Sequence, residues 1–302
     1  MKRCLSRIEV VAGCGFERDP FKHVNFRTGD GVRIKSLLKM AVNSGSMISI
    51  IGDRGMGKTE AITTALNQMS ARQVSVRSAD KDHLLITDIE YAIIYDLSDE
   101  SPKRGREIRA RQLRRILGEA SSKQSVVLVI EEGHRLHPST LRALKTLREM
   151  DWMGKKELFS VVLVGQSDPM AKRGVSEVRL RSDSVFMRGL SQAEVAGYIQ
   201  ATVGKVFADD AIHRIAGLAE STNFLDLQEV LVCLMGDMLA TGAEHVTAAD
   251  VDAMFSIAQE SVPRVVVKKE KPVSAGTGNT AVKDILARRR GDGGGEKIAV
   301  NE

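Results

Sequence analysis

Apolar residues follow two different patterns along the first two thirds of the chain. Short segments typical of buried strands occur at residues 47–51, 73–76, 126–130, 159–166 and 184–187. Between them, apolar positions recur at helical spacing in residues 32–41, 60–66, 84–97, 101–117 and 139–150. Strands that alternate with helices form parallel sheets whose two faces are both covered. The pattern therefore predicts an α/β fold built on a parallel sheet.

The pattern changes near residue 190, after which only amphipathic helical stretches remain. These stretches cover residues 191–203, 208–221, 225–239 and 247–259. Thr247 with Asp250 approximates a capping box for the last of them. Residues 1–30 show no regular pattern, and the residues after Pro263 are too polar to form a core. We therefore expect four regions: an irregular segment (1–30), an α/β core (31–189), a helical subdomain (190–262) and a basic, disordered tail (263–302).

The composition fits a protein of one or two globular domains, with 302 residues that are 43% hydrophobic and 27% charged. Its three cysteines include no C-x-x-C pair, which argues against a disulfide framework or a zinc site. No apolar run reaches the ~20 residues that span a bilayer, and the first residues lack a signal-peptide core. We expect a cytoplasmic protein with no membrane partner. A net charge of +5 permits an anionic partner.

A phosphate-binding motif of the form G-x-x-x-x-G-K-[ST] lies between the strand at 47–51 and the helix at 60–66. Its residues are Gly52, Asp53, Arg54, Gly55, Met56, Gly57, Lys58 and Thr59, followed by Glu60. The glycines allow a tight turn whose N–H groups face phosphate oxygens. Lys58 would bind the β- and γ-phosphates, and Thr59 would ligate Mg²⁺. The alternative is a glycine-rich turn that precedes a helix by chance. Such a turn would not require the strand, the Lys-Thr pair and the helix to be in register, so we predict ATP and Mg²⁺ as cofactors.

Two acids, Glu131 and Glu132, follow the apolar strand at 126–130. An apolar strand that ends in two acids is the pattern of a Walker B element, in which the first acid holds the Mg²⁺ shell and the second polarises water. The first acid is normally Asp, and the extra methylene of Glu131 displaces its carboxylate by about one C–C bond. The alternative is a pair of acids that merely caps a strand end.

Further polar residues follow the same strands. Gln166 ends the strand at 159–166, and strand carboxyl ends face the ligand crevice of open α/β sheets. We therefore expect Gln166 to reach the γ-phosphate or the attacking water. His134 and His137 have H-x-x-H spacing, but Pro138 follows them and the nearest acids are assigned to Mg²⁺. We interpret both histidines as loop or helix-cap residues.

Residues 101–117 carry seven cations against the single acid Glu107. The cations are Lys103, Arg104, Arg106, Arg109, Arg111, Arg114 and Arg115. The helix expected here has a narrow apolar face formed by Ile108, Leu113, Ile116 and Leu117. Two interpretations stay open, a solvated helix face and a surface that contacts phosphates. On the second, the candidate DNA contacts are Lys81, Lys103, Arg104, Arg106, Lys155 and Lys156.

Residues 20–260 resemble an AAA+ ATPase core followed by its helical lid. Within that superfamily the chain looks like the group that contains the phage Mu B transposition protein and its transposon relatives TnsC and TniB, with the secretion ATPase ExeA nearby. The motifs behind the resemblance are Gly-Lys-Thr-Glu-Ala (57–61), the basic segment (102–115), Glu-Gly-His-Arg-Leu (132–136) and Val-Leu-Val-Gly-Gln (162–166).

The resemblance implies an ATPase that binds duplex DNA without sequence specificity and recruits or activates a DDE-type transposase in a bacterial host. Its subunits would assemble head-to-tail into a ring or helical filament. Catalysis would use Glu132 and Gln166, with Arg179 or Arg181 supplied by the neighbouring subunit. Two features depart from the group: residues 1–30 are too short for its helix-turn-helix domain, and Asp226 occupies the position of a second-sensor arginine.

Two other functions fit the same core. A replicative helicase loader shares the fold and also binds nucleic acid, but its partner is a hexameric helicase. An ExeA-like secretion ATPase would require a transmembrane segment and a periplasmic module, and we expect neither. Genomic proximity to a DDE-type integrase, or DNA-stimulated ATP hydrolysis, would separate the transposition function from these alternatives.

Overall fold

The computed structural model describes residues 5–22, 24, 26–76, 84–218 and 222–260. The chain divides into two compact units, one formed by Arg27–Arg188 and the other by Met1–Phe26 together with Gly189–Glu302. The tail expected at 263–302 and the candidate contact Lys81 lie outside the described residues. No helix among the described residues is both long enough and apolar enough to cross a membrane.

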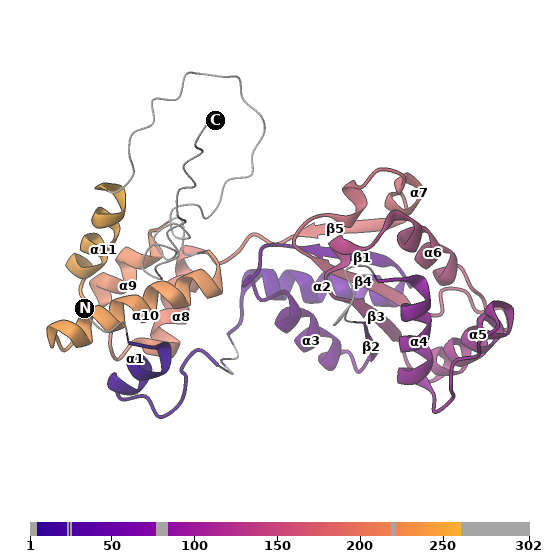
Figure 1. Cartoon of the computed structure of the whole chain (residues 1–302), viewed down its shortest axis with the longest axis horizontal. Helices are drawn as coiled ribbons and strands as arrows, with labels where there is room; N and C mark the ends of the chain where they lie inside the picture. The colour runs from indigo at the N-terminus through magenta and orange to yellow at the C-terminus, as the bar shows by residue number, and fades with distance from the viewer. Residues whose placement is uncertain (1–4, 23, 25, 77–83, 219–221, 261–302) are drawn as a thin grey trace, which may run out of the picture. The chain divides into compact units, whose positions relative to one another are not determined.

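The first unit contains a five-stranded sheet in which the order is β2-β3-β4-β1-β5 (Figure 1). The strands are β1 (Met47–Ile51), β2 (Arg72–Val76), β3 (Val126–Ile130), β4 (Ser160–Gly165) and β5 (Ser182–Phe186). All four neighbouring pairs are parallel. Every residue of β1, β3 and β4 is buried, which explains their continuous apolar sequences. The parallel α/β sheet predicted from the sequence is confirmed.

Helices cover both faces of this sheet. They are α2 (Gly29–Asn43), α3 (Lys58–Gln68), α4 (Ile86–Leu97), α5 (Arg106–Lys123), α6 (Pro138–Arg148) and α7 (Ser176–Arg179), with 3₁₀ turns η1 (Gly133–Arg135) and η2 (Pro169–Ala171). Successive residues of a strand point to opposite faces. Val127 and Val129 accordingly pack in the core with α2 and α3, whereas Leu128 and Ile130 pack in the core with α4, α5 and α6.

The strand register brings three functional segments to one edge of the sheet. Ile51 pairs with Gly165 in β4, and Ile130 pairs with Leu163 in the same strand. The loop after β1, the acids after β3 and the polar end of β4 therefore meet at the carboxyl ends of neighbouring strands. This is the edge at which open α/β sheets bind ligands.

One local prediction in this unit is wrong, whereas the interpretation of His137 as a helix-cap residue is confirmed. Ile108, expected on the apolar face of the basic helix, is 60% exposed, because Arg109 takes the buried position in the first turn of α5. The N-cap of α6 is His137, whose imidazole Nδ1 accepts the Ser139 N–H at 3.3 Å. Pro138 takes the first helical position, where its missing N–H has no helical partner to lose.

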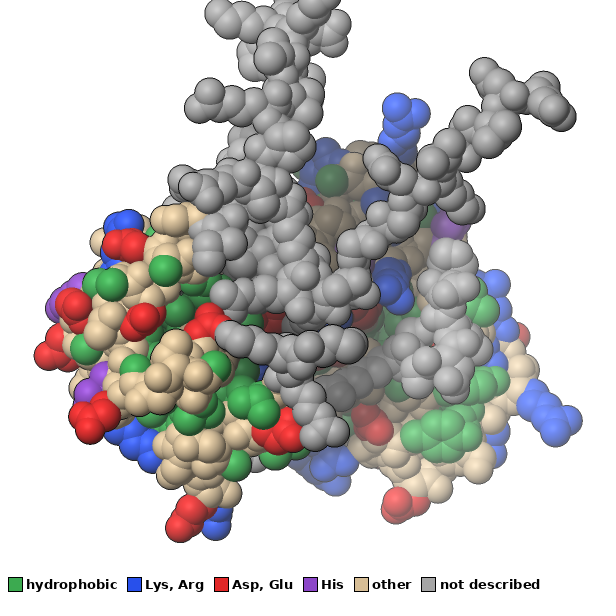
Figure 2. Space-filling view, turned by 60° about the vertical axis from the view of Figure 1, so that its left-hand side comes forward, with side chains coloured by type: hydrophobic (Ala, Val, Ile, Leu, Met, Phe, Trp, Pro, Cys, Tyr) green, Lys and Arg blue, Asp and Glu red, His purple; other side chains and the backbone are tan. Residues whose placement is uncertain are grey.

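The second unit is all-helical among its described residues. Its helices are α1 (Arg7–Gly13), α8 (Gln192–Val203), α9 (Asp209–Ala216), α10 (Phe224–Thr241) and α11 (Ala248–Glu260). The four helices predicted after residue 190 are therefore confirmed. Thr247 donates its backbone N–H to Asp250 at 2.8 Å, as the capping box requires. The visible face of these helices mixes acidic, basic and apolar side chains (Figure 2).

The N-terminal residues belong to this helical unit and are not simply irregular. Ser6 caps α1 through a capping box with Glu9, and Val10 is buried in the same core as α8 and α10. Phe21 and Phe26 both contact the ring of Tyr198, with centroid separations of 6.5 and 5.5 Å. Both phenylalanines therefore pack into the core of the helical unit.

Candidate active site

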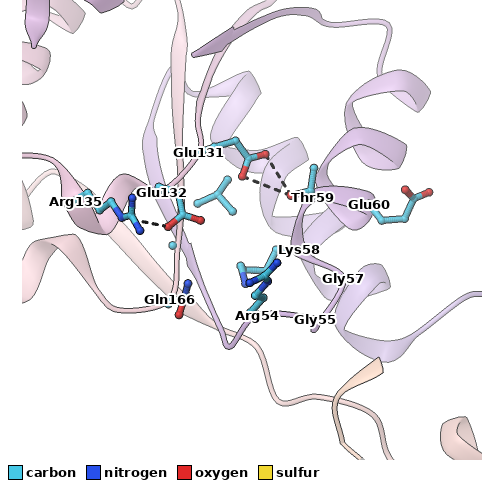
Figure 3. Close-up of a pocket in the computed structure, with 12 residues that line it drawn as sticks. Arg54, Gly55, Gly57, Lys58, Thr59, Glu60, Glu131, Glu132, Arg135 and Gln166 are labelled. Atoms are coloured by element: carbon cyan, nitrogen blue, oxygen red, sulfur yellow. Dashed lines mark hydrogen bonds and ion pairs between the residues drawn. The ribbon is translucent and has the colours of Figure 1, made fainter. Parts of the chain in front are cut away.

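Six of the nine residues predicted to bind nucleotide, and both acids of the Walker B element, line one pocket of about 420 Å³ (Figure 3). Gly52, Asp53 and Met56 belong to the same loop but do not line the pocket. Its walls come from the β1–α3 loop, the start of α3, the end of β3 with η1, and the end of β4. The lining residues are Arg54, Gly55, Gly57, Lys58, Thr59, Glu60, Glu131, Glu132, Arg135, Val164, Gly165 and Gln166. Segments more than 100 residues apart in sequence thus meet around a single polar cavity.

The β1–α3 loop has the backbone conformation that its glycines allow. Gly55 and Gly57 have φ angles of 93° and 79°, which residues with a Cβ rarely adopt. Gly57 is the N-cap of α3, so the helix begins at Lys58 and directs its first N–H groups at the pocket. A Cβ at Gly52 would lie 2.9 Å from the Met56 sulfur, which explains the first glycine by close packing. The loop is therefore formed as an anion-binding turn.

Lys58 is folded onto this loop. Its Nζ donates to the carbonyl oxygens of Gly52 and Asp53, both at 2.8 Å. Burial lowers the pKa of Lys58, and the nearby charges of Glu132, Asp53 and Glu131 oppose that shift. Phosphate oxygens would replace the two carbonyls as acceptors and supply the negative charge that favours the ammonium form.

Thr59 and Glu131 place two oxygen ligands close together. The Thr59 hydroxyl donates to Glu131 Oε1 at 3.2 Å (Figure 3). Neighbouring oxygen ligands of an octahedral Mg²⁺ are separated by about 3 Å, since each Mg–O distance is ~2.1 Å. A hydroxyl and a carboxylate at this separation fit the Mg²⁺ shell. Although Glu131 is one methylene longer than the usual Asp, its carboxylate therefore still lies where it can join the Mg²⁺ shell.

Glu132 begins the η1 turn in a left-handed conformation, with φ 54° and ψ 32°. Such a backbone costs a non-glycine residue on the order of 1 kcal/mol and is found mainly at functional sites. Its Oε2 atom lies 3.5 Å from His134 Nε2 and 3.7 Å from Arg135 Nε. Gln166 follows β4 and lies on the same side of the pocket as Glu132, across from the P-loop (Figure 3).

Arg135 is a pocket residue that the sequence analysis missed. Its position was predictable in part, because residues three apart share a face of a helical turn and Glu132 was already assigned. Its guanidinium lies beside Glu132 and is 63% exposed. The pocket thus has three cationic side chains, Arg54, Lys58 and Arg135.

Arg179 and Arg181 do not line the pocket of their own chain. Arg179 Nε donates to the Met170 carbonyl at 2.8 Å, and the Arg181 guanidinium forms an ion pair with Glu149. Both arginines are exposed at the end of α7. This position agrees with the expectation that either one acts on a neighbouring subunit, but it does not distinguish between them.

Four of the six arginines of the basic segment are paired with acids, three of them with acids from other parts of the unit. Arg109 is 6% exposed and donates to Glu90 at 2.7 Å. Arg111 pairs with Glu107, Arg114 with Asp151, and Arg115 with Glu100 and Glu119. Counting only Glu107, the single acid within the segment, therefore underestimates how much of the positive charge is neutralised. Much of this charge stabilises the fold of α5.

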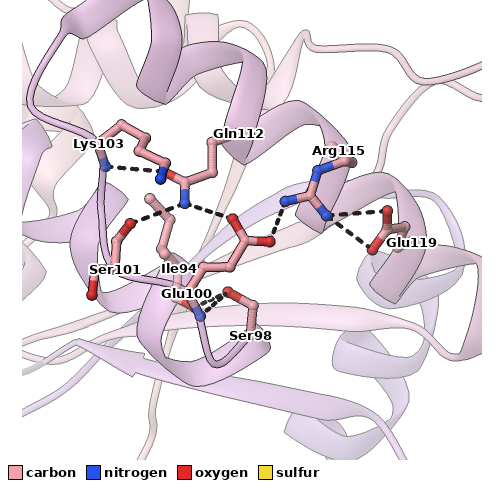
Figure 4. Close-up of polar contacts among 8 residues, drawn as sticks. All are labelled: Ile94, Ser98, Glu100, Ser101, Lys103, Gln112, Arg115 and Glu119. Atoms are coloured by element: carbon pink, nitrogen blue, oxygen red, sulfur yellow. Dashed lines mark hydrogen bonds and ion pairs between the residues drawn. The ribbon is translucent and has the colours of Figure 1, made fainter.

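The remaining cations lie on a loop that α5 holds in place. Gln112 accepts the Lys103 N–H at 3.1 Å and donates to Glu100 and to the Ser101 carbonyl (Figure 4). Hydrogen bonds from Gln112 and Arg115 lower the pKa of Glu100. Among the described residues, no ion pair involves the exposed side chains of Lys103, Arg104 and Arg106.

The two lysines predicted in the 151–156 loop differ in their surroundings. Lys155 Nζ donates to the Ser121 carbonyl at the end of α5, at 2.5 Å, while Lys156 is exposed. Trp152 packs so closely on α5 that a Cβ at Gly118 would lie 2.2 Å from its ring. The loop therefore packs beside the C-terminal part of α5, whereas Lys103, Arg104 and Arg106 lie at or before its N-terminal end.

Comparisons with known proteins agree with the fold described above. Residues 42–172 match the model of a family described as an AAA domain. The structure is similar to Cdc6p from Pyrobaculum aerophilum (TM-score 0.61, 16% identity, covering 81% of this chain and 71% of that one). It is also similar to the Drosophila ORC bound to DNA (0.55, 13%, 87% and 71%) and to the Aeropyrum pernix ORC1 protein in complex with DNA (0.50, 14%, 78% and 68%). No curated protein sequence matches the chain.

Proposed function

We propose that this chain, which has the fold of an AAA+ P-loop ATPase, hydrolyses ATP to control its assembly on duplex DNA. One observation carries the proposal: Lys58, Thr59, Glu131, Glu132 and Gln166 line a single pocket at the carboxyl ends of parallel strands. Lys58 is a cation that can bind phosphate, and Thr59 and Glu131 can ligate a metal ion. Glu132 is a carboxylate that can accept a proton, and Gln166 is a polar group that can orient water.

ATP would bind with its phosphates on the turn between β1 and α3. Loop N–H groups and Lys58 would hold the phosphates, while Thr59 and Glu131 would hold Mg²⁺, which neutralises charge on the transferred group. Glu132 would take the proton of the attacking water, and Gln166 would fix the position of that water or of the γ-phosphate. The remaining charge would be stabilised by Arg179 or Arg181 of an adjacent subunit.

Duplex DNA is the partner that best fits the loop 102–106. Its cations Lys103, Arg104 and Arg106 are exposed on a backbone fixed by Gln112 and Arg109, which limits the loss of entropy on binding. Lysines and arginines contact phosphates without reading bases, so we expect little sequence preference. Lys155 and Lys156 would extend this surface. Two of the similar solved structures contain DNA, which supports the same partner class.

More specifically, we propose that the assembly recruits or activates a DDE-type transposase. It depends on the sequence resemblance carried by residues 57–61, 102–115, 132–136 and 162–166. The similarity of the whole chain to Cdc6 and ORC structures favours a second candidate, a role in loading a replicative helicase. Both roles use ATP-dependent assembly on DNA and differ in the protein that the assembly recruits.

The experiment that tests the proposal measures ATP hydrolysis by the full chain with and without duplex DNA, beside Glu132→Gln as the inactive control. DNA-stimulated turnover that this substitution removes is the expected result, whereas no turnover under any condition would contradict the proposal. The ATP-bound assembly on DNA is then offered a DDE-type transposase or a hexameric helicase. Stimulated strand transfer would support the first role, and helicase loading would support the second.

A further inference from the structure

His134 connects two parts of the pocket that are distant in sequence. The residue is in the η1 turn, and its ring packs against the end of β4, where a Cβ on Gly165 would lie 3.1 Å from Nδ1. Nδ1 accepts the backbone N–H of Gln166 at 3.3 Å. The side chain is only 19% exposed. The imidazole is therefore held between the Walker B turn and the end of the neighbouring strand.

This contact determines which ring nitrogen carries the proton. A nitrogen that accepts an N–H cannot itself be protonated, so the neutral ring carries its hydrogen on Nε2. Nε2 faces Glu132 and lies 3.5 Å from its Oε2 atom. In the absence of substrate, catalytic contacts are often longer than they become when the site is complete. The ring is thus oriented to donate to Oε2.

Two side chains approach the Glu132 carboxylate. Oε2 is the oxygen nearest to both His134 and Arg135. The two partners differ, since the His134 side chain is 19% exposed and packs against the end of β4, whereas the Arg135 side chain is 63% exposed. The histidine is therefore the more firmly held of the two contacts.

We infer that His134 is a positioning residue for Glu132, which it ties to the end of β4 so that the carboxylate keeps the orientation in which it accepts a proton from the attacking water. The inference rests on the proposed ATP hydrolysis and adds a role for a residue that the sequence analysis treated as a loop histidine. Because Gln166 directly follows β4 and donates its N–H to His134, the same ring fixes the relative position of the two groups that act on water. Loss of such positioning lowers kcat without a comparable change in ATP affinity.

Substitutions can separate the two contacts of the ring. The amide of Asn occupies the position of Nδ1, so His134→Asn retains an acceptor for the Gln166 N–H. The amide of Gln reaches the position of Nε2, so His134→Gln retains a donor for Glu132. His137→Ala is the matched control, because His137 is only three residues away but caps α6, and its described side-chain contacts are with Ser139 rather than with Glu132 or Gln166.

The experiment measures kcat for ATP hydrolysis, the affinity for a fluorescent ATP analogue and the thermal unfolding temperature of each full-length variant. We expect His134→Ala to lower kcat about 10- to 100-fold with ATP affinity near that of the wild type. His134→Gln should recover more of the rate than His134→Asn, and His137→Ala should keep it. In a Glu132→Gln background, His134→Ala should cause no further loss, because the histidine acts through Glu132.

The outcomes separate this inference from the proposed function. A wild-type kcat in folded His134→Ala, or a rate that Asn restores better than Gln, would overturn the positioning role. So would a full additional loss in the Glu132→Gln background. If the wild type itself did not hydrolyse ATP, the proposed function would be wrong. If hydrolysis depends on Glu132 but not on His134, only the positioning role is wrong.

Discussion

Lys58 and Glu132 lie in the same pocket but would act at different stages of the reaction. Lys58 holds phosphate in the bound state, so Lys58→Ala should abolish detectable ATP binding. Glu132 acts on water in the transition state, so Glu132→Gln should bind ATP normally and lower kcat by ~10²-fold or more. Binding of a fluorescent ATP analogue and phosphate release measure the two effects. Turnover by Glu132→Gln at the wild-type rate would show that the Walker B assignment is wrong.

Arg109 differs from the other cations of its segment because it is part of the core. It donates to Glu90 and to the carbonyls of Lys103 and Arg104, and its side chain is 7% exposed. Arg109→Met would leave Glu90 without this partner, so we expect a decrease of about 3 kcal/mol in the free energy of unfolding. Urea denaturation measures this decrease in the free energy of unfolding. The exposed Arg106→Met is the control and should stay within about 0.5 kcal/mol.

Equal stability of these two variants would mean that the buried ion pair does not contribute to folding. The comparison matters for function as well. A DNA-binding defect in an Arg109 variant would be indirect, because Arg109 holds the backbone of the loop and does not reach its surface.

At the scale of elements, the sheet was predictable because burial on both faces makes strand sequences continuously apolar. The P-loop, the acids after β3 and Gln166 then follow at the same edge, since parallel strands align their carboxyl ends. The environment of α5 was not predictable in this way. Arg109 is neutralised by Glu90 on α4 and takes the buried position in the first turn of α5, while Ile108 in the same turn is exposed.

The N-terminal helix could not be placed from the sequence for a similar reason. Arg7 contacts Gln228, which is 221 residues away, and the burial of α1 depends on α10. A seven-residue helix has little periodicity of its own, and its stability comes from such packing. The role inferred for His134 also depends on a long-range contact, because Gln166 is 32 residues later in the chain.

The loop before α5 is the element on which DNA binding depends. Neutralising Lys103, Arg104 and Arg106 together should weaken binding to all duplexes alike and lower the salt slope by up to ~3 units, about one for each phosphate that is no longer neutralised. Fluorescence anisotropy at several salt concentrations, with a non-hydrolysable ATP analogue, measures both the DNA affinity and its salt slope. Alanine at Arg27, Lys35 and Lys39, which are exposed on this unit in and just before α2, is the charge-matched control.

An unchanged slope in the first triple variant would support the alternative of a solvated helix face. An equal decrease in both triple variants would mean that binding responds only to net charge. We also expect ATP to strengthen binding, because an assembly aligns many weak phosphate-binding sites along one duplex.

At the scale of the whole molecule, catalysis should require two subunits. Arg179 and Arg181 lie outside the pocket of their own chain, and Arg181 would have to leave Glu149 to reach a neighbour. Substituting the trans-acting arginine with alanine should preserve ATP binding and lower turnover ~10³-fold. The other arginine then serves as the control. This comparison would identify which of the two residues acts.

Mixing two inactive variants tests the shared site directly. An arginine variant has an intact pocket but cannot complete its neighbour's site, whereas Lys58→Ala can complete a neighbour's site but cannot bind ATP in its own. In mixed assemblies, some pockets of the arginine variant will face the intact arginine of a Lys58→Ala subunit. ATP turnover should therefore reappear and pass through a maximum as the mixing ratio changes. Both proteins must first be shown to assemble on DNA together, for example by co-sedimentation of differently labelled subunits. If they co-assemble and remain inactive at every ratio, each subunit must contain all of its own catalytic groups.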